Sequence, residues 1–186
     1  MKRAVILHGT MGSPEGNWFR WLETSLESRG YEVWLPTLPH AEQPSLSEWI
    51  EFVGNNSPFP LDGDVLIIGH SSGAILGLLL LQSGFTVGAF VGVSIFLDNS
   101  LQWDPNNRLF DVPFIWDKLK KTTTKRLIIN SETDPYVPVE QAQTIAKNTN
   151  TELLVVPKQG HFNLEQSEDY KQFPKLIEIL EERNLL

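Results

Sequence analysis

Short apolar runs alternate with longer amphipathic segments along the chain. Six of the runs are rich in valine, isoleucine and leucine, and several are apolar at nearly every position. Such continuous runs are typical of parallel strands that are covered on both faces. We therefore expect strands at residues 4–7, 32–35, 65–68, 87–93, 126–130 and 152–156.

Helical patterns separate or follow these runs. The first, at about 17–29, has large apolar residues at helical spacing and stops at Gly30. The second begins at Ser45 and ends near Gly54, with Glu48 three positions after Ser45 as in a capping box. A third, leucine-rich helix follows residues 69–73 and runs to about Ser83. Two more are expected at about 139–147 and 170–183.

The regular order of strand and helix predicts the fold class. It indicates an α/β protein, with a doubly wound parallel sheet of about six strands in a compact three-layer sandwich. Ligands of such sheets bind beyond the carboxyl ends of the strands. Since no internal repeat, linker or low-complexity tract interrupts the pattern, residues 1–186 are expected to form a single domain.

The longest irregular stretch, at about 94–117, is rich in aromatic side chains. Loops of this length inside a compact domain are usually functional or disordered, and this one is too apolar for disorder. It either folds over part of the functional site or packs at the periphery. In the first case Phe96, Trp103, Phe110 and Phe114 are candidates to contact a substrate.

Composition and charge narrow the function classes. The chain has no cysteine, which excludes disulfides, thiolate catalysis and cysteine-ligated zinc. Its formal net charge of −8, with no basic cluster longer than Lys120-Lys121, argues against nucleic acid as a partner. No apolar run approaches the roughly 18 residues of a membrane-spanning helix. The amino-terminal apolar run stops after four residues at His8, too short for a signal peptide. We expect a cytoplasmic protein without a membrane partner.

The sequence Gly69-His70-Ser71-Ser72-Gly73 lies between the third predicted strand and the leucine-rich helix. This G-x-S-x-G pattern is that of a nucleophile elbow, a tight strand-turn-helix that holds a serine hydroxyl clear of the sheet. Glycine is needed at both flanking positions because side chains there would collide across the turn. Ser71 is therefore the candidate nucleophile, and the alternative is an ordinary surface loop of glycine and serine.

A nucleophilic serine needs a neighbouring base. His161 follows the last predicted strand, so it emerges at the same edge of the sheet as Ser71. His70 belongs to the turn itself and points away. His161 is the expected general base.

The base in turn needs an orienting acid. Asp134 follows the strand at 126–130, and Pro135 fixes a turn that would place Asp134 beside the base. Asp134 is the favoured acid. Asp98, after the preceding strand, is a competitor, and Glu132 is a neighbour that remains possible.

The oxyanion that forms during acyl transfer needs two preorganised N–H donors. The first is expected to be the amide of Ser72 at the helix start, where the helix dipole adds to it. The second should come from residues 8–12, where Gly9 permits close approach of the backbone. The Thr10 amide is favoured and the Met11 amide is the alternative. Met11 is also a candidate to contact the substrate.

No cofactor and no metal is expected. Residues 8–12 lack the G-x-G-x-x-G spacing of a dinucleotide site. The chain has no cysteine and no two histidines at ligand spacing. His40, in the proline-bounded loop 36–44, either rims the pocket or is simply solvated.

Several of these segments together resemble a known family. They are the first strand with His8-Gly9, the elbow at 69–73, Asp134-Pro135-Tyr136-Val137-Pro138 and Gly160-His161-Phe162-Asn163. They are similar to the small α/β serine hydrolases of the retinoblastoma-binding serine hydrolase and YdeN group, over essentially the whole chain. The resemblance implies an α/β-hydrolase fold without a separate lid domain, and a triad of Ser71, Asp134 and His161. It implies little about the substrate.

The leading hypothesis is a hydrolase of small carboxylic esters that works through an acyl-serine intermediate, with a small-molecule ester as its partner. The same groups would also serve a thioesterase, an amidase or an acyltransferase. A binding protein that keeps the fold without useful turnover is the alternative from another class. A pure binder has no reason to keep a strained elbow, so the sequence favours an enzyme.

Overall fold

The strands form one parallel sheet whose order places the site. A computed structural model describes residues 1–98, 108–122 and 124–186. In these residues six parallel strands are arranged in the order β2-β1-β3-β4-β5-β6, which confirms the predicted sheet. The strands are β1 Arg3–Leu7, β2 Glu32–Trp34, β3 Val65–His70, β4 Ala89–Val93, β5 Lys125–Ser131 and β6 Glu152–Val156.

The strand order reverses between β1 and β3. From β1 the chain moves outward to β2 and then returns to the other side of β1 to form β3. Ligands of open parallel sheets bind in the crevice at the carboxyl ends of the strands where the order reverses. Residues 8–12 follow β1 and the turn at Ser71 follows β3, so both predicted parts of the oxyanion site begin at this point.

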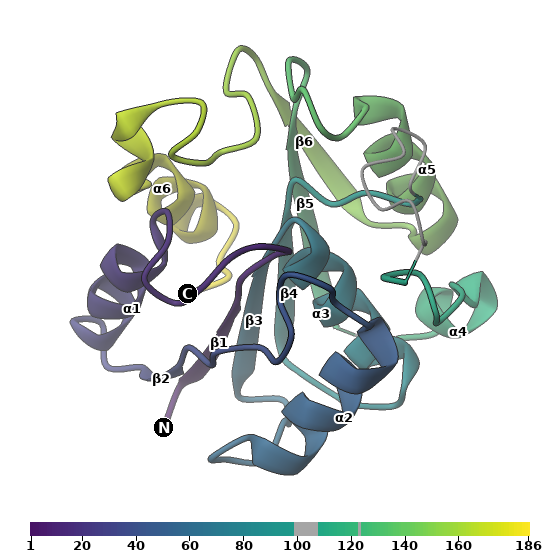
Figure 1. The fold of residues 1–186 in the computed structure, drawn as a ribbon. Helices are drawn as coiled ribbons and strands as arrows, with labels where there is room; N and C mark the ends of the chain where they lie inside the picture. The colour runs from purple at the N-terminus through teal and green to yellow at the C-terminus, as the bar shows by residue number, and fades with distance from the viewer. Residues whose placement is uncertain (99–107, 123) are drawn as a thin grey trace.

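Helices cover both faces of the sheet and make the predicted three layers (Figure 1). Side chains alternate along each strand: Val5 of β1 points to one apolar core and Ala4 to the other. One face is covered by α1 Phe19–Glu27 and α6 Pro174–Glu182. The other is covered by α2 Leu46–Asn56, α3 Ser72–Gln82, α4 Trp116–Lys120 and α5 Val139–Thr149.

Helix α3 is buried along its whole length. Each of its residues is buried, because the helix packs against β3 and β4 on one side and contacts α2 and α4 on others. A Cβ atom at Gly77 would lie 2.6 Å from Cε2 of Phe90 on β4, so this glycine allows the close approach of helix and sheet. The position of the α3 N-terminus, which carries Ser71, is thereby fixed by the core.

Residues 108–115 of the irregular stretch pack against the core and the helix ends rather than over the pocket. Leu109 is fully buried in the core, and Asp111 accepts hydrogen bonds from the side chains of Ser45 and Ser47 at the start of α2. Gln82 at the end of α3 donates to Pro113 O at 2.9 Å. Residues 108–115 therefore anchor two helix ends.

The carboxy-terminal helix begins later than predicted. A 3₁₀-helix, Glu168–Lys171, comes first, and α6 starts only at Pro174. The expectation of one helix from residue 170 was wrong because proline lacks an N–H and restricts the residue before it, and Phe173 has an extended φ of −141°. Proline is favoured at the first position of a helix for the same reason.

The predicted capping box of α2 is half formed. Ser45 Oγ accepts the Glu48 N–H at 3.2 Å. The Glu48 carboxylate lies 2.9 Å from His40 Nδ1 instead of returning to the Ser45 amide. Within the described ranges, no helix is long and apolar enough to cross a membrane.

Candidate active site

Ser71 lies at the apex of the turn between β3 and α3, in a strained backbone conformation. Its φ of 58° and ψ of −126° are rare for a residue with a Cβ. The Ser71 N–H donates to Val93 O at 2.8 Å, which ties the turn to β4. A Cβ at Gly69 would lie 2.3 Å from Gly73 O, so the tight turn requires glycine at position 69.

Gly73 is required for a different reason from the one predicted. Its Cβ would not meet the other side of the turn but the end of β1, at 2.3 Å from Leu7 O and 2.4 Å from His8 O. Gly9 also lies close to the turn, since its Cβ would be 2.8 Å from Ser71 Cβ and 3.3 Å from Ser71 Oγ. The glycines therefore bring the segment after β1 directly against the candidate nucleophile.

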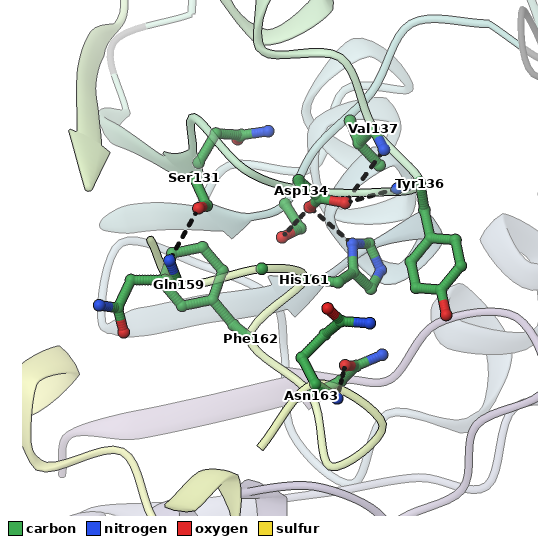
Figure 2. A network of polar contacts seen from close by, with 12 residues as sticks. Ser131, Asp134, Tyr136, Val137, Gln159, His161, Phe162 and Asn163 are labelled. Atoms are coloured by element: carbon green, nitrogen blue, oxygen red, sulfur yellow. Dashed lines mark hydrogen bonds and ion pairs between the residues drawn. The ribbon is translucent and has the colours of Figure 1, made fainter. Parts of the chain in front are cut away.

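His161 and Asp134 meet across the loops after β6 and β5 (Figure 2). His161 Nδ1 and Asp134 Oδ2 are 2.7 Å apart, and the side chains are 8% and 0% exposed, so the pair is shielded from solvent. An ionised carboxylate only accepts hydrogen bonds, which places the proton on Nδ1 and leaves the Nε2 lone pair free to accept another.

Three further donors hold the Asp134 carboxylate. The amides of Tyr136 and Val137 donate to Oδ1 at 2.9 and 3.0 Å, and Ser94 Oγ donates to Oδ2 at 3.0 Å. Sequence reasoning missed Ser94 in this role. The available signal was a polar residue directly after β4, at the same sheet edge, and its φ of 52° turns the chain there.

The loops that carry the pair are also joined by hydroxyl groups. Ser131 Oγ at the end of β5 accepts the Gln159 N–H at 3.0 Å (Figure 2). Thr133 Oγ1 accepts the Gly160 N–H at 3.3 Å. These two hydrogen bonds fix the relative position of the two loops just before Asp134 and His161.

The two competing acids lie elsewhere. Asp98 Oδ1 accepts from Gln141 Nε2 on α5 at 2.9 Å, and Glu132 is exposed. Of the described carboxylates, Asp134 is the one hydrogen-bonded to His161.

His70 holds the backbone of His161 in place. Its Nε2–H donates to the His161 carbonyl at 2.8 Å, and its ring lies among Trp18, Phe19 and His161. Burial, followed by the neighbouring His161 charge, lowers the pKa of His70 to about 3. His70 is therefore a neutral donor near pH 7, which positions the backbone of His161.

The predicted backbone donors after β1 already have acceptors. The Thr10 N–H donates to Ser72 Oγ at 2.6 Å, and the Met11 N–H donates to Ala41 O at 2.7 Å. The Ser72 amide begins α3 and has no acceptor inside the helix. The structure thus brings Ser72 and Thr10 together, but the contact is between the Ser72 side chain and the Thr10 amide rather than between two free backbone donors.

His8 holds this segment in place. It is fully buried, its Nε2 accepts the Leu38 N–H at 3.0 Å, and its Nδ1 lies 3.0 Å from Gly9 O. Burial lowers the pKa of His8, against a smaller opposing effect of the bond to Gly9. The neutral ring links the turn after β1 to the loop after β2.

A pocket of about 230 Å³ opens over these groups. Ser71 and His161 both line it, although no hydrogen bond joins their side chains in the described structure. Its lining residues are Thr10, Met11, Ser71, Phe96, Tyr136, Val137, His161, Asn163 and Glu165.

Two of the predicted substrate contacts, Met11 and Phe96, line the pocket. Phe110 packs edge-on against Phe96 at 5.7 Å between ring centroids, and Phe114 stacks on Trp116, so neither lines the pocket as described. Trp103 lies outside the described residues.

His40 is exposed and pairs with Glu48, away from the pocket, as a solvated loop histidine would. Tyr136, Asn163 and Glu165 were not predicted as lining residues. Tyr136 Oη donates to Glu165 Oε2 at 2.6 Å, a hydrogen bond that raises the pKa of Tyr136.

A larger hollow of about 590 Å³ lies behind the His161 loop, between Gly160 and Tyr170. It contains neither Ser71 nor His161, so we place the chemistry in the smaller pocket. In the described parts of the chain, no cluster of three or more histidine, cysteine, aspartate or glutamate residues is arranged to hold a metal ion.

The chain is similar to known hydrolases along nearly its whole length. A family model described as serine hydrolase matches residues 4–182. The chain is 26% identical over 184 residues to serine hydrolase RBBP9 of Rattus norvegicus, covering 96% of this chain and 95% of that protein. It is 26% identical over 182 residues to the putative hydrolase YdeN of Bacillus subtilis, covering 96% and 94%.

Solved structures show the same fold. The crystal structure of the Bacillus subtilis ydeN gene product superposes with a TM-score of 0.86 at 23% identity, over 98% of each chain. An alpha/beta hydrolase enzyme from a lagoon-sediment metagenome of Mar Chica, Morocco, superposes with a TM-score of 0.69 at 21% identity, over 98% of this chain and 92% of that one.

Proposed function

Because the chain belongs to the serine hydrolase family and has the α/β-hydrolase fold, we propose that Ser71, His161 and Asp134 form a catalytic triad that hydrolyses small carboxylic esters. The observation that carries this proposal is the convergence of three separate loops on one pocket. A strained serine and a histidine bound to a buried carboxylate both line it. Backbone strain of this kind persists only where the surrounding structure enforces it.

In the acylation step, Ser71 Oγ attacks the acyl carbon of the ester while His161 Nε2 takes the hydroxyl proton. Asp134 keeps the other ring proton on Nδ1 and stabilises the imidazolium that forms. The carbonyl oxygen becomes an oxyanion next to the Ser72 amide and the positive end of the α3 dipole. His161 then protonates the departing alkoxide, and an alcohol leaves.

In the deacylation step, water replaces the alcohol. His161 Nε2 accepts a proton from the water, whose oxygen attacks the acyl-serine carbonyl. Collapse of the second oxyanion returns the proton to Ser71 Oγ and releases a carboxylic acid. No cofactor is needed to balance either step.

The pocket lining supports small, uncharged or cationic substrates. Phe96 and the exposed side chain of Met11 offer apolar contact for an acyl group. Among the described lining residues Glu165 adds a negative charge, and none is a lysine or arginine. The net charge of −8 disfavours anionic esters further, within the roughly 8–10 Å over which charge acts at physiological salt.

The same triad would act on thioesters or amides, or pass the acyl group to a nucleophile other than water. A binding protein without turnover is the remaining alternative. None of the described lining residues is a group that favours thioester, amide or transfer chemistry over ester hydrolysis. The strained Ser71 backbone favours an enzyme over a binding protein.

The direct test compares Ser71→Ala with Ser83→Ala, a matched change at an exposed serine at the end of α3. With p-nitrophenyl acetate, Ser71→Ala should lower kcat/KM by about 10⁴-fold or more. It should also abolish labelling by a fluorophosphonate probe, which reacts only with an activated serine. Ser83→Ala should match the wild type in both assays. A Ser71→Ala protein that keeps activity within tenfold of the wild type would exclude Ser71 as the nucleophile.

A further inference from the structure

The Ser72 side chain is buried between the elbow and the segment after β1. It is 0% exposed, and its Oγ accepts the Thr10 N–H at 2.6 Å and lies 2.8 Å from Thr10 Oγ1. In the described part of the chain the Ser72 hydroxyl makes no hydrogen bond other than these two. One of the two hydroxyl groups therefore donates its proton to the other.

Only one arrangement of the protons satisfies the buried group. If Thr10 donated its hydroxyl proton to Ser72, the Ser72 proton would be buried without an acceptor, which is costly. Ser72 Oγ–H therefore donates to Thr10 Oγ1. The Thr10 hydroxyl proton is then left without an acceptor in the described residues, and Thr10 is a half-buried residue that lines the pocket beside Ser71.

Three backbone amides of this segment already have acceptors. The amides of Thr10, Met11 and Gly12 donate to Ser72 Oγ, Ala41 O and Gly9 O respectively. Neither of the two amides predicted as the second oxyanion donor, those of Thr10 and Met11, is therefore free, which directs attention to a side chain of this segment. The one hydroxyl of this segment that lines the pocket is that of Thr10.

We propose that the Thr10 hydroxyl, and not its amide, is the second donor of the oxyanion hole, and that Ser72 Oγ is the positioning group that aims it. This assignment rests on the proposed acyl transfer at Ser71. The Ser72 residue then contributes twice: its amide donates to the oxyanion, and its side chain fixes the rotamer and the proton of Thr10. The chain of two hydroxyls is preorganised before substrate binds, which is what oxyanion stabilisation requires.

The two assignments predict opposite effects for Ser72→Ala. If the Thr10 amide is the donor, removing Ser72 Oγ frees that amide, and kcat stays the same or rises. If the Thr10 hydroxyl is the donor, the same change releases its orientation, and kcat falls by about tenfold or more while KM changes little. An unchanged or increased kcat for Ser72→Ala overturns the proposal.

The kcat values of Thr10 variants test the proposal independently. Thr10→Val keeps the shape and the amide but removes the hydroxyl, and it should lower kcat for p-nitrophenyl acetate by roughly 10²–10³-fold, the effect of one lost oxyanion donor. Thr10→Ser restores a hydroxyl and should recover most of that loss. Thr86→Val, at an exposed threonine away from the site, is the matched control. A Thr10→Val enzyme with the kcat of the wild type contradicts the proposal.

Fluorophosphonate labelling and Ser71→Ala separate the possible failures. If the wild type is not labelled and Ser71→Ala keeps its activity, the proposed function itself fails. If Ser71 is required but Ser72→Ala and Thr10→Val turn over like the wild type, only the hydroxyl assignment fails. Urea unfolding of each variant shows whether a loss of activity comes from a loss of folding. Should Thr10→Val not fold, Ser72→Ala still decides the question, because the two assignments predict opposite effects for it.

Discussion

The Asp134 carboxylate receives hydrogen bonds from two backbone amides, Ser94 Oγ and His161 Nδ1. The two amides and Ser94 fix the orientation of the carboxylate, and the fixed carboxylate in turn orients the His161 ring. The hydrogen bond of Ser94 to Asp134 and that of Tyr136 Oη to Glu165 each join two loops that are far apart in the sequence. The polar contacts around His161 therefore depend on how the loops pack.

Asp134→Asn should leave a folded protein with activity lowered by roughly 10³–10⁴-fold, because an amide no longer selects the tautomer with the proton on Nδ1. Asp98→Asn is the matched change at a carboxylate that contacts α5. It should alter kcat/KM for p-nitrophenyl acetate by less than about tenfold, as expected for a residue away from the chemistry. The reverse order of the two effects would move the acid to the loop after β4.

His70 makes the stability of the fold depend on pH. Its pKa is about 3 in the folded state, lowered first by burial, against roughly 6.5 for an unfolded histidine. Between these values the unfolded chain binds the extra proton. The free energy of unfolding should thus fall as pH drops from about 6.5 toward 3, by up to about 1.4 kcal/mol per pH unit from this group.

Urea unfolding at pH 7, 5.5 and 4.5 tests this dependence. His70→Gln keeps an N–H donor for the His161 carbonyl but does not titrate, so its stability should decrease less with falling pH than that of the wild type. His40→Gln, at an exposed histidine, should follow the wild type. Equal pH dependence in all three proteins would mean that His70 is not held neutral by burial.

At the scale of elements, the start of α3 packs closely against the end of β1. The backbone of Gly73 lies against the carbonyls of Leu7 and His8, and Gly9 lies against Ser71. The core buries α3 on all sides, so the helix has no room to move away from the strand. The strained turn at Ser71 is held by this packing.

Gly73→Ala should therefore destabilise the protein by at least about 2 kcal/mol, since the added methyl group must displace backbone rather than a flexible side chain. Gly63→Ala is the control, because a Cβ there meets nothing within 4 Å. It should change the free energy of unfolding by less than about 0.5 kcal/mol. Urea denaturation measures both values, and similar stabilities for the two variants would show that β1 and α3 can separate at small cost.

At the scale of the whole molecule, the site is a pocket at the carboxyl edge of one sheet. The described residues that line it come from the turn after β3 and from the loops after β1, β4, β5 and β6. The sequence left open whether the irregular stretch covers the site or packs at the periphery. Residues 108–115 hold the start of α2 and the end of α3. Phe96 is the aromatic residue of the described irregular stretch that reaches the pocket.

A pocket of about 230 Å³ should select short acyl groups. Drug-sized ligands need roughly 300–1,000 Å³, so in a series of p-nitrophenyl esters from acetate to palmitate we expect the highest kcat/KM at about C2–C8. The Ser71→Ala protein gives the background rate for each ester. A maximum at palmitate would mean that the acyl chain is bound by a surface outside the described pocket.

The elements that sequence reasoning located well are those set by local rules. Strand and helix positions followed from the spacing of apolar residues, and the elbow followed from the glycines that a tight turn needs. The observed boundaries differ from the predicted ones where one residue restricts the next, as at Pro174, where α6 begins later than predicted. The capping box of α2 is half formed because Glu48 has His40 as a partner from another loop.

The sequence by itself determined the parallel sheet, the serine at its turn, and a small set of histidines and carboxylates at one edge, because hydrophobic periodicity and turn sterics act over a few residues. Only the tertiary structure decided which groups bond to which. The contact of Thr10 with Ser72 spans 62 positions and that of Ser94 with Asp134 spans 40. Such hydrogen bonds depend on the packing of whole strands and helices, and no local pattern in the chain encodes their geometry.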